Sequence, residues 1–159
     1  MIRQAAGEIA LADEAATSSL GAALAGALQV GEAICLTGAL GAGKSTLARA
    51  LIRALTTPAE DVPSPTFTLV QFYEGAGLKV AHFDLYRLSR PEEAAEIGLD
   101  EALDEGCAVI EWPERLGDDP AAWLGPDRLT VTLAEQGDGR LATVSGVGAW
   151  EAKLKDLHV

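Results

Sequence analysis

The sequence predicts an α/β fold built on a parallel sheet, and three features indicate this. An apolar run of strand length, residues 33–37, leads into a glycine-rich loop that is followed at once by an amphipathic helical pattern. A second apolar run, residues 107–110, is typical of a strand buried on both faces of a parallel sheet. Alternating segments around glycine turns, within 68–84 and 128–147, predict antiparallel hairpins beside that parallel core.

The chain is predicted to begin with a helix over residues 11–28, which are rich in alanine and leucine. Asp13 and Glu14 fall in its first turn, where negative charge suits the helix dipole. Asp13 can equally be the N-cap, because its carboxylate is able to accept a bond from a free backbone N–H. Gly31 closes this segment before the first strand.

The loop after that strand carries the clearest chemistry in the chain. Residues 38–46 read Gly-Ala-Leu-Gly-Ala-Gly-Lys-Ser-Thr and match the phosphate-binding pattern G-x-x-x-x-G-K-[ST]. The glycines let successive backbone N–H groups turn toward phosphate oxygens, and the helix N-terminus that follows favours an anion. Lys44 would reach the β- and γ-phosphates, and the Ser45 hydroxyl would bind Mg²⁺. The loop therefore predicts a nucleoside triphosphate site.

A helix, a loop and a hairpin are predicted after the phosphate-binding pattern. Leucines at helical spacing indicate a helix over 44–55, and two prolines predict a non-helical loop over 61–66. Residues 68–74 and 79–84 are predicted to pair as a hairpin around Gly75-Ala76-Gly77.

Two short helices and a buried strand are expected next. Ser89-x-x-Glu92 predicts a capping box for a helix that ends near Ile97. Gly98 separates it from a second helix over 99–105, and the strand 107–110 ends at Glu111 before a loop over 112–115.

The C-terminal part is predicted to be a hairpin with a short tail. Residues 128–134 alternate, with Leu129, Val131 and Leu133 on one face, and residues 140–147 return after a glycine turn. The tail 150–159 is expected to be a short helix or a frayed end.

Composition favours one globular domain over residues 1–159, with 48% hydrophobic residues. The formal net charge of −12 and the absence of a Lys/Arg run argue against strong autonomous binding of nucleic acid. No apolar run is long enough for a membrane span, and Met1-Ile2-Arg3-Gln4 does not begin a signal peptide. Cys35 and Cys107 lie in apolar runs and are expected to be buried thiols, the alternative being a disulfide or metal pair. We therefore expect a cytoplasmic protein.

Two acids at strand ends are the expected companions of the phosphate loop. Glu111 follows four apolar residues, which is the pattern of a carboxylate that manages Mg²⁺, and Asp84 ends the strand 79–84. Both would lie at the carboxyl edge of the sheet, where one fixes the ion and the other orients the attacking water. The structural alternative is that one of them caps a helix or that Asp84 pairs with Arg87.

Three further side chains near these motifs each allow two interpretations. Thr66 either senses the γ-phosphate and Mg²⁺, as switch loops do, or bonds its own backbone. His82 has no evident partner and is expected to be a packed neutral histidine rather than a base. Trp112 is expected to be a core aromatic rather than a lid over the site.

Four motifs together resemble one family. They are residues 38–46, Ser-Pro-Thr-Phe-Thr-Leu-Val (64–70), His-Phe-Asp-Leu-Tyr-Arg-Leu (82–88) and Ile-Glu-Trp-Pro-Glu (110–114). In this order they resemble the TsaE family (also called YjeE), small bacterial ATPases needed for threonylcarbamoyladenosine modification of tRNA. The first motif alone indicates only a phosphate loop, whereas the other three are specific to the family.

The resemblance implies a three-layer fold similar to P-loop NTPases, with ATP and Mg²⁺ as cofactors. It implies TsaD- and TsaB-like partners, with ATP hydrolysis supporting repeated turnover of the modifying complex rather than attaching the carbamoyl group. It also implies site residues: Gly41, Ala42, Gly43, Lys44, Ser45 and Thr46 for the phosphates, Ser45 and Glu111 for Mg²⁺, Asp84 for hydrolysis, and Glu14 and Arg140 as nucleotide contacts outside the loop. The chain departs from the family at Ala39, commonly Asp, and at Ser45, usually Thr, although serine keeps the hydroxyl.

Two other classes of function are compatible with a phosphate loop. A small-molecule kinase generally needs a mobile lid with several arginines, and the arginines here are scattered. A non-catalytic module would use ATP only to order the loop 61–68 and expose a partner surface.

Overall fold

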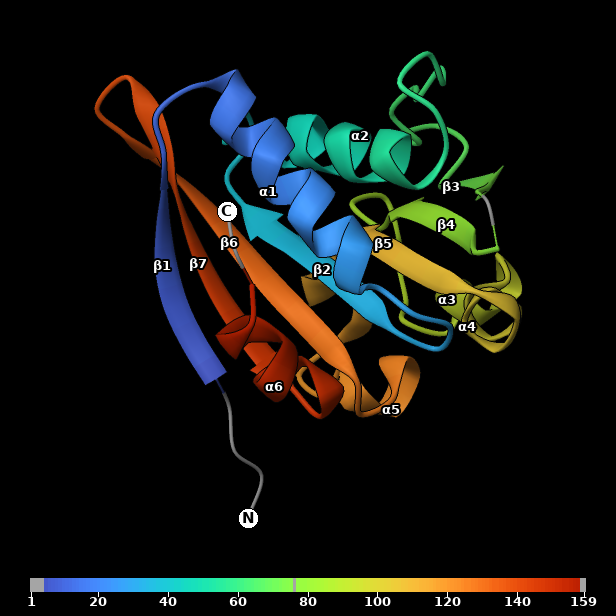
Figure 1. Cartoon of the computed structure of the whole chain (residues 1–159). Coiled ribbons are helices and arrows are strands. Elements are labelled where there is room, and N and C mark those ends of the chain that lie inside the picture. Colours follow the sequence, from blue (N-terminus) through green and yellow to red (C-terminus); the bar gives the residue numbers. More distant parts are fainter. Residues whose placement is uncertain (1–4, 76, 158–159) are drawn as a thin grey trace.

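A computed structural model describes residues 5–75 and 77–157, and a seven-stranded mixed sheet runs through its centre (Figure 1). The order of strands is β1-β7-β6-β2-β5-β4-β3. Strands β6, β2, β5 and β4 are parallel neighbours, and β7, β1 and β3 are added antiparallel at the sides. The strands are β1 Ala5–Leu11, β2 Ala33–Gly38, β3 Val70–Glu74, β4 Lys79–Asp84, β5 Cys107–Glu111, β6 Arg128–Gln136 and β7 Gly139–Val147. The predicted α/β class, with a parallel core and antiparallel additions, is confirmed.

Helices cover both faces of this sheet and make three layers. The helices are α1 Glu14–Ala27, α2 Lys44–Leu55, α3 Glu93–Glu96, α4 Leu99–Glu105, the 3₁₀ helix η1 Pro113–Leu116, α5 Ala121–Leu124 and α6 Ala149–Lys155. Helices α1 and α2 lie side by side over one face, which α6 also covers, and the others pack against the opposite face (Figure 1). None of the helices in the described residues combines the length and apolar character that crossing a bilayer requires.

The central strands are buried on both sides because alternate residues enter two separate cores. In β2, Ile34 and Leu36 pack under α1 and α2, whereas Ala33 and Cys35 face the core under α4. Strand β5 divides in the same way, so its continuous apolar run follows from a parallel strand with helices on both faces. Full burial of a large aliphatic side chain contributes about 1.5–3 kcal/mol.

The predicted helix over 11–28 is confirmed except at its ends, because Leu11 is the last residue of β1, a strand over residues 5–11 that was not predicted. β1 pairs with β7 over its whole length, and this pairing outweighs the helical propensity of the alanines and of Leu11. The helix α1 begins at Glu14, and Asp13 is its N-cap, since its Oδ1 accepts a bond from the Ala16 N–H at 2.9 Å.

Other boundaries differ from the prediction for local reasons. Glu93, not Glu92, closes the turn before α3, because its Oε1 accepts bonds from the N–H groups of Ser89 and Arg90. Residues 66–69 form a turn, so β3 begins at Val70 and is shorter than the predicted 68–74. Residues 113–116 form η1 where a loop was expected, and α5 was not predicted at all. The predicted tail, residues 150–159, contains α6, and its residues 158–159 lie outside the described part of the chain. Residues 1–4 and Ala76 of the predicted turn also lie outside it.

Both cysteines are buried free thiols, as predicted. Cys35 and Cys107 belong to the two different cores, on opposite faces of the sheet. Burial raises the pKa of each thiol to about 12, so both stay protonated at neutral pH.

The contact between α1 and α2 is close at Gly21 and gives a test of the packing. A Cβ added there would lie 2.8 Å from Ala50 Cβ and 2.9 Å from the Leu51 nitrogen. We expect Gly21→Ala to lower the free energy of unfolding by about 1–3 kcal/mol, measured by urea denaturation. Gly26→Ala is the matched control, because no atom lies within 4 Å of the added Cβ, and it should stabilise by up to about 1 kcal/mol. Equal stabilisation by both substitutions would contradict this packing.

Candidate functional site

The glycine-rich loop joins β2 to α2 at the carboxyl edge of the parallel sheet. Gly38, Gly41 and Gly43 have φ values of 134°, 81° and 106°, a region that side chains disfavour. Gly38 also runs against β6, and any Cβ there would collide with the carbonyl oxygen of Leu133. The glycines are therefore needed for the curl of the loop and for its close approach to the sheet.

Lys44, the first residue of α2, is folded back over this loop. Its side chain is only 5% exposed, and Nζ donates a bond of 2.5 Å to the Gly38 carbonyl. Desolvation lowers the pKa of Lys44, and the carboxylates of Glu111, Glu114 and Asp84 partly oppose that shift. The ammonium group of Lys44 is therefore fixed by the loop at the N-terminus of α2.

Trp112 covers this lysine. Lys44 Nζ lies 3.6 Å from the centroid of a Trp112 ring, within the range of a cation–π contact. Trp112 is half-buried and also packs against the core under α4, so it combines the two roles between which the sequence left a choice. Its φ of 60° is strained for a tryptophan and turns the chain sharply after β5.

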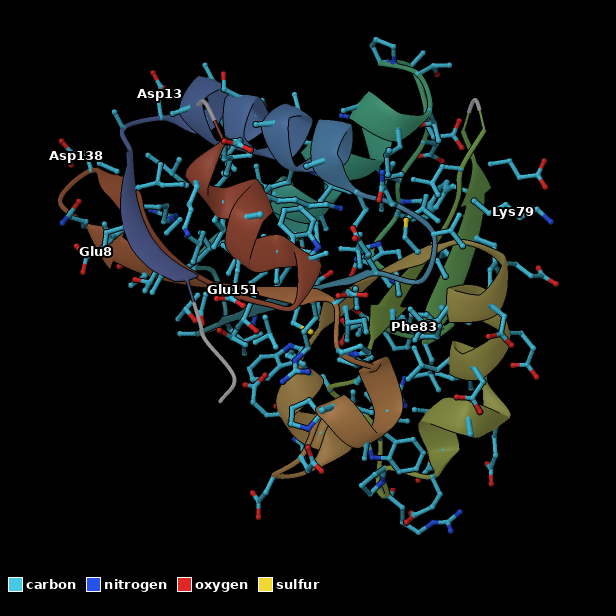
Figure 2. All side chains as sticks on the ribbon, turned by 60° about the horizontal axis from the view of Figure 1, so that its bottom comes forward. Glu8, Asp13, Lys79, Phe83, Asp138 and Glu151 are labelled. Carbon is cyan, nitrogen blue, oxygen red and sulfur yellow. The ribbon has the colours of Figure 1, made fainter. Side chains whose placement is uncertain are left out.

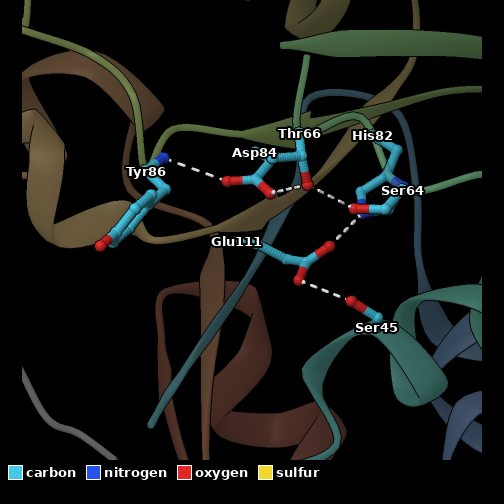
Figure 3. Close-up of polar contacts among 7 residues, drawn as sticks. All are labelled: Ser45, Ser64, Thr66, His82, Asp84, Tyr86 and Glu111. Atoms are coloured by element: carbon cyan, nitrogen blue, oxygen red, sulfur yellow. Dashed lines mark hydrogen bonds and ion pairs between the residues drawn. The ribbon is translucent and has the colours of Figure 1, made fainter. Parts of the chain in front are cut away.

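Glu111 ends β5 and is held from two sides (Figure 3). Its Oε1 accepts a bond of 3.3 Å from the Ser45 hydroxyl, and its Oε2 lies 2.6 Å from Nε2 of His82. Glu111 and His82 are 3% and 2% exposed, so the pair is shielded from water. The expectation that His82 lacks a partner is wrong. Sequence reasoning missed this contact because it depends on the register between β4 and β5.

Asp84 lies beside Glu111 in the parallel register of β4 and β5. Its Oδ2 accepts a bond of 3.2 Å from the Thr66 hydroxyl, and its Oδ1 accepts one of 3.0 Å from the Tyr86 N–H (Figure 3). Thr66 therefore ties the proline-rich loop to the strand end instead of bonding its own backbone. Arg87 forms no ion pair with Asp84 in the part of the chain that the structure describes, and its guanidinium lies 5.3 Å from the ring centroid of Phe67.

Arg140 and Glu14 lie on the other side of the loop. Arg140 Nε donates to the Ala42 carbonyl at 3.0 Å, and Nη2 donates to the Gly41 carbonyl at 3.2 Å. Together with Thr46 and Glu14, Arg140 lines a hollow of about 280 Å³ next to Gly43. The loop thus has space beside it and an arginine that braces its backbone.

Ser45 and Glu111 offer two oxygen ligands for a divalent cation at the helix N-terminus. Mg²⁺ is usually bound by one or two protein oxygens together with phosphates and water, and these two residues fit that requirement. No group of three or more His, Cys, Asp or Glu side chains suited to a metal is found among the described residues.

A curled glycine loop between a parallel strand and a helix, with a lysine at its end and carboxylates on the next strands, defines a P-loop-like α/β protein. A family profile described as "Threonylcarbamoyl adenosine biosynthesis protein TsaE" matches residues 11–142. The chain belongs to the TsaE family.

Several proteins named tRNA threonylcarbamoyladenosine biosynthesis protein TsaE are similar to this chain. The one from Nostoc sp. is 36% identical over 135 residues, which cover 82% of this chain and 80% of that protein. The Aquifex aeolicus protein is 41% identical over 109 residues, 68% of this chain and 77% of that one. The Rickettsia felis protein is 39% identical over 104 residues, and the match spans 65% of this chain and only 61% of that protein's length.

A solved structure shows the same fold. The crystal structure of Bacillus subtilis YdiB superposes on this chain with a TM-score of 0.73. The match covers 98% of this chain and 94% of the YdiB chain. The identity is 24%, so this likeness concerns the fold alone.

The contact between His82 and Glu111 can be tested by a double-mutant cycle. Removing either side chain leaves a buried polar group without its partner, so the loss in His82→Ala and in Glu111→Ala should overlap. We expect a coupling of about 1–3 kcal/mol in the free energy of unfolding, measured in urea without nucleotide. Additivity of the two single variants within about 0.5 kcal/mol would show that the contact is not formed.

Proposed function

We propose that this protein binds ATP and Mg²⁺ at the loop 38–46 and hydrolyses the ATP, as a subunit that supports threonylcarbamoyl modification of adenosine in tRNA. The observation that carries the hydrolytic part is the contact between Ser45 and Glu111, which sets a hydroxyl and a carboxylate together beneath the loop. The pathway rests on membership of the TsaE family and on the names of the similar proteins.

In this proposal the loop binds the phosphates through its backbone. The N–H groups of Gly41 to Thr46 and the N-terminus of α2 favour an anion, because the first amides of a helix lack partners. Lys44 would exchange the Gly38 carbonyl for phosphate oxygens, which match an ammonium group better than a neutral carbonyl does. The hollow lined by Glu14 and Arg140 would take the remainder of the nucleotide.

The two carboxylates, Glu111 and Asp84, have different roles in this proposal. Ser45 and Glu111 would hold Mg²⁺, which neutralises charge on the phosphates, and His82 keeps Glu111 in place. Asp84, fixed by Thr66 at the end of β4, would orient the attacking water. Ala39 lacks the acid that the family commonly has there, so this chain would hydrolyse ATP without it.

The surface around the site supports protein partners. Leu40, Phe67 and Tyr86 come from three loops at this edge and are 75%, 84% and 43% exposed. Large apolar side chains exposed on the loops around a site favour a docking surface there. We propose that TsaD- and TsaB-like proteins dock there, and that the net charge of −12 leaves contact with tRNA to them. Two free thiols support a cytoplasmic location.

Phosphate release without any acceptor tests the proposed activity. We expect Lys44→Ala to reduce kcat/KM at least 100-fold relative to the wild type, because the phosphates lose the positive charge that the loop itself supplies beside Mg²⁺. Hydrolysis by Lys44→Ala at the wild-type rate would overturn the proposal. Strict dependence on a small-molecule acceptor would instead indicate a kinase, and tight ATP binding without turnover, even with partners present, would indicate a binding module.

The roles of Glu111 and Asp84 can be distinguished by how their variants respond to the Mg²⁺ concentration. We expect Glu111→Gln to raise the Mg²⁺ concentration for half-maximal hydrolysis at least tenfold, because a ligand to the ion is lost. Asp84→Asn should keep that concentration within about twofold of the wild type and lower kcat by about 10²–10⁴. Titrations of the initial rate of phosphate release against Mg²⁺ give both values. The reverse pattern would exchange the roles of the two residues.

A further inference from the structure

A groove of about 560 Å³ lies between the β3–β4 hairpin and the helices α3 and α4. Its apolar lining includes Phe72, Ala81, Ile97 and Ala102. Lys79 and Cys107, which begin β4 and β5, also line it, whereas the phosphate site lies where these strands end. The groove is therefore at the opposite edge of the sheet from the loop 38–46 and is not explained by nucleotide binding.

The groove borders an open sheet edge. Strand β3 is the last strand of the sheet, and its outer side pairs with no other strand in the described residues. Phe72 in the middle of β3 is 64% exposed, although strand β4 beside it is almost wholly buried. Edge strands usually avoid exposed aromatic side chains, because these promote pairing with another chain.

Negative charge is concentrated on the helical wall of this groove. Residues 92–105 contain seven of the chain's 24 acidic residues and no basic one. Four glutamates lie at the groove: Glu74, Glu96, Glu101 and Glu105. The one basic residue in the lining, Lys79, is 4.0 Å from Glu74 and 3.8 Å from Glu105, and Arg90, outside the lining, is 3.7 Å from Glu96. The four glutamates still outnumber these two cations, so a negative excess remains.

We propose that this groove binds an extended, basic and apolar segment of a partner protein. The segment adds a strand to the open edge of β3 and places an apolar side chain beside Phe72. Its lysine or arginine side chains face Glu101 and Glu105 across the groove. The open edge favours an extended chain over a helix, and the acidic wall excludes a nucleic acid. This interaction is separate from the nucleotide site.

A random library of 12-residue peptides displayed on phage tests the proposal with the full chain as bait. We expect selected peptides to alternate apolar residues with at least two lysines or arginines. A synthetic peptide of the selected consensus should bind Glu101→Lys/Glu105→Lys at least tenfold more weakly than the wild type, measured by fluorescence anisotropy.

The matched control is Glu8→Lys/Asp156→Lys, which changes the net charge by the same amount at exposed positions. Figure 2 shows Glu8 on the far side of the molecule from Lys79 at the groove. The affinity of this control and of Lys44→Ala for the peptide should lie within about twofold of the wild-type value. Peptide binding is thereby tested independently of the proposed nucleotide site. Thermal unfolding checks that all variants are folded.

Three results would overturn the proposal. The first is a selection that yields no peptides preferring the wild type over Glu101→Lys/Glu105→Lys. The second is equal weakening by the two charge-reversal variants, which would indicate attraction by net charge alone. The third is unchanged binding of a consensus peptide with prolines at alternate positions, because proline cannot donate the bonds of an added strand.

Discussion

The site depends on one buried carboxylate, Glu111, and on the two groups that hold it. Burying a carboxylate is costly unless hydrogen bonds replace its water, and here the Ser45 hydroxyl and the His82 ring do so. Each group comes from a different element: β5, the first turn of α2, and β4. The parallel alignment of these strands is therefore what assembles the site.

The same alignment links the site to its surroundings. Glu111 stands beside Asp84 in register, and Asp84 holds Thr66, so the proline-rich loop is fixed to the strand that flanks the carboxylate. On the other side, Trp112 follows Glu111 directly and covers Lys44. These contacts connect the phosphate loop to two other loops, which carry the exposed apolar side chains Phe67 and Tyr86. A movement of the phosphate loop would therefore shift both of them.

The sequence predicted those parts of the fold that are determined locally. The helices 44–55 and 99–105 have the predicted bounds. Gly98 and Gly106 flank the second helix, and the first follows Gly43 and ends with its last regularly spaced leucine, Leu55. Strand β1 was missed because it exists only through its pairing with β7, whose residues lie 129 to 141 positions further along the chain. The partner of His82 was missed for the same reason, since only the register of β4 against β5 brings it to Glu111. The phosphate loop was recognisable because the spacing of its glycines and lysine determines its backbone conformation without distant contacts.

In the proposed function, Glu111 and Ser45 form the protein side of an Mg²⁺ site next to the loop 38–46. A crystal structure with a non-hydrolysable ATP analogue and Mg²⁺ tests it most directly. The account predicts β- and γ-phosphates enclosed by the loop amides and Lys44, with the ion bound to the Ser45 hydroxyl and to Glu111 directly or through one water. A nucleotide bound elsewhere, or an ion remote from both side chains, would contradict it.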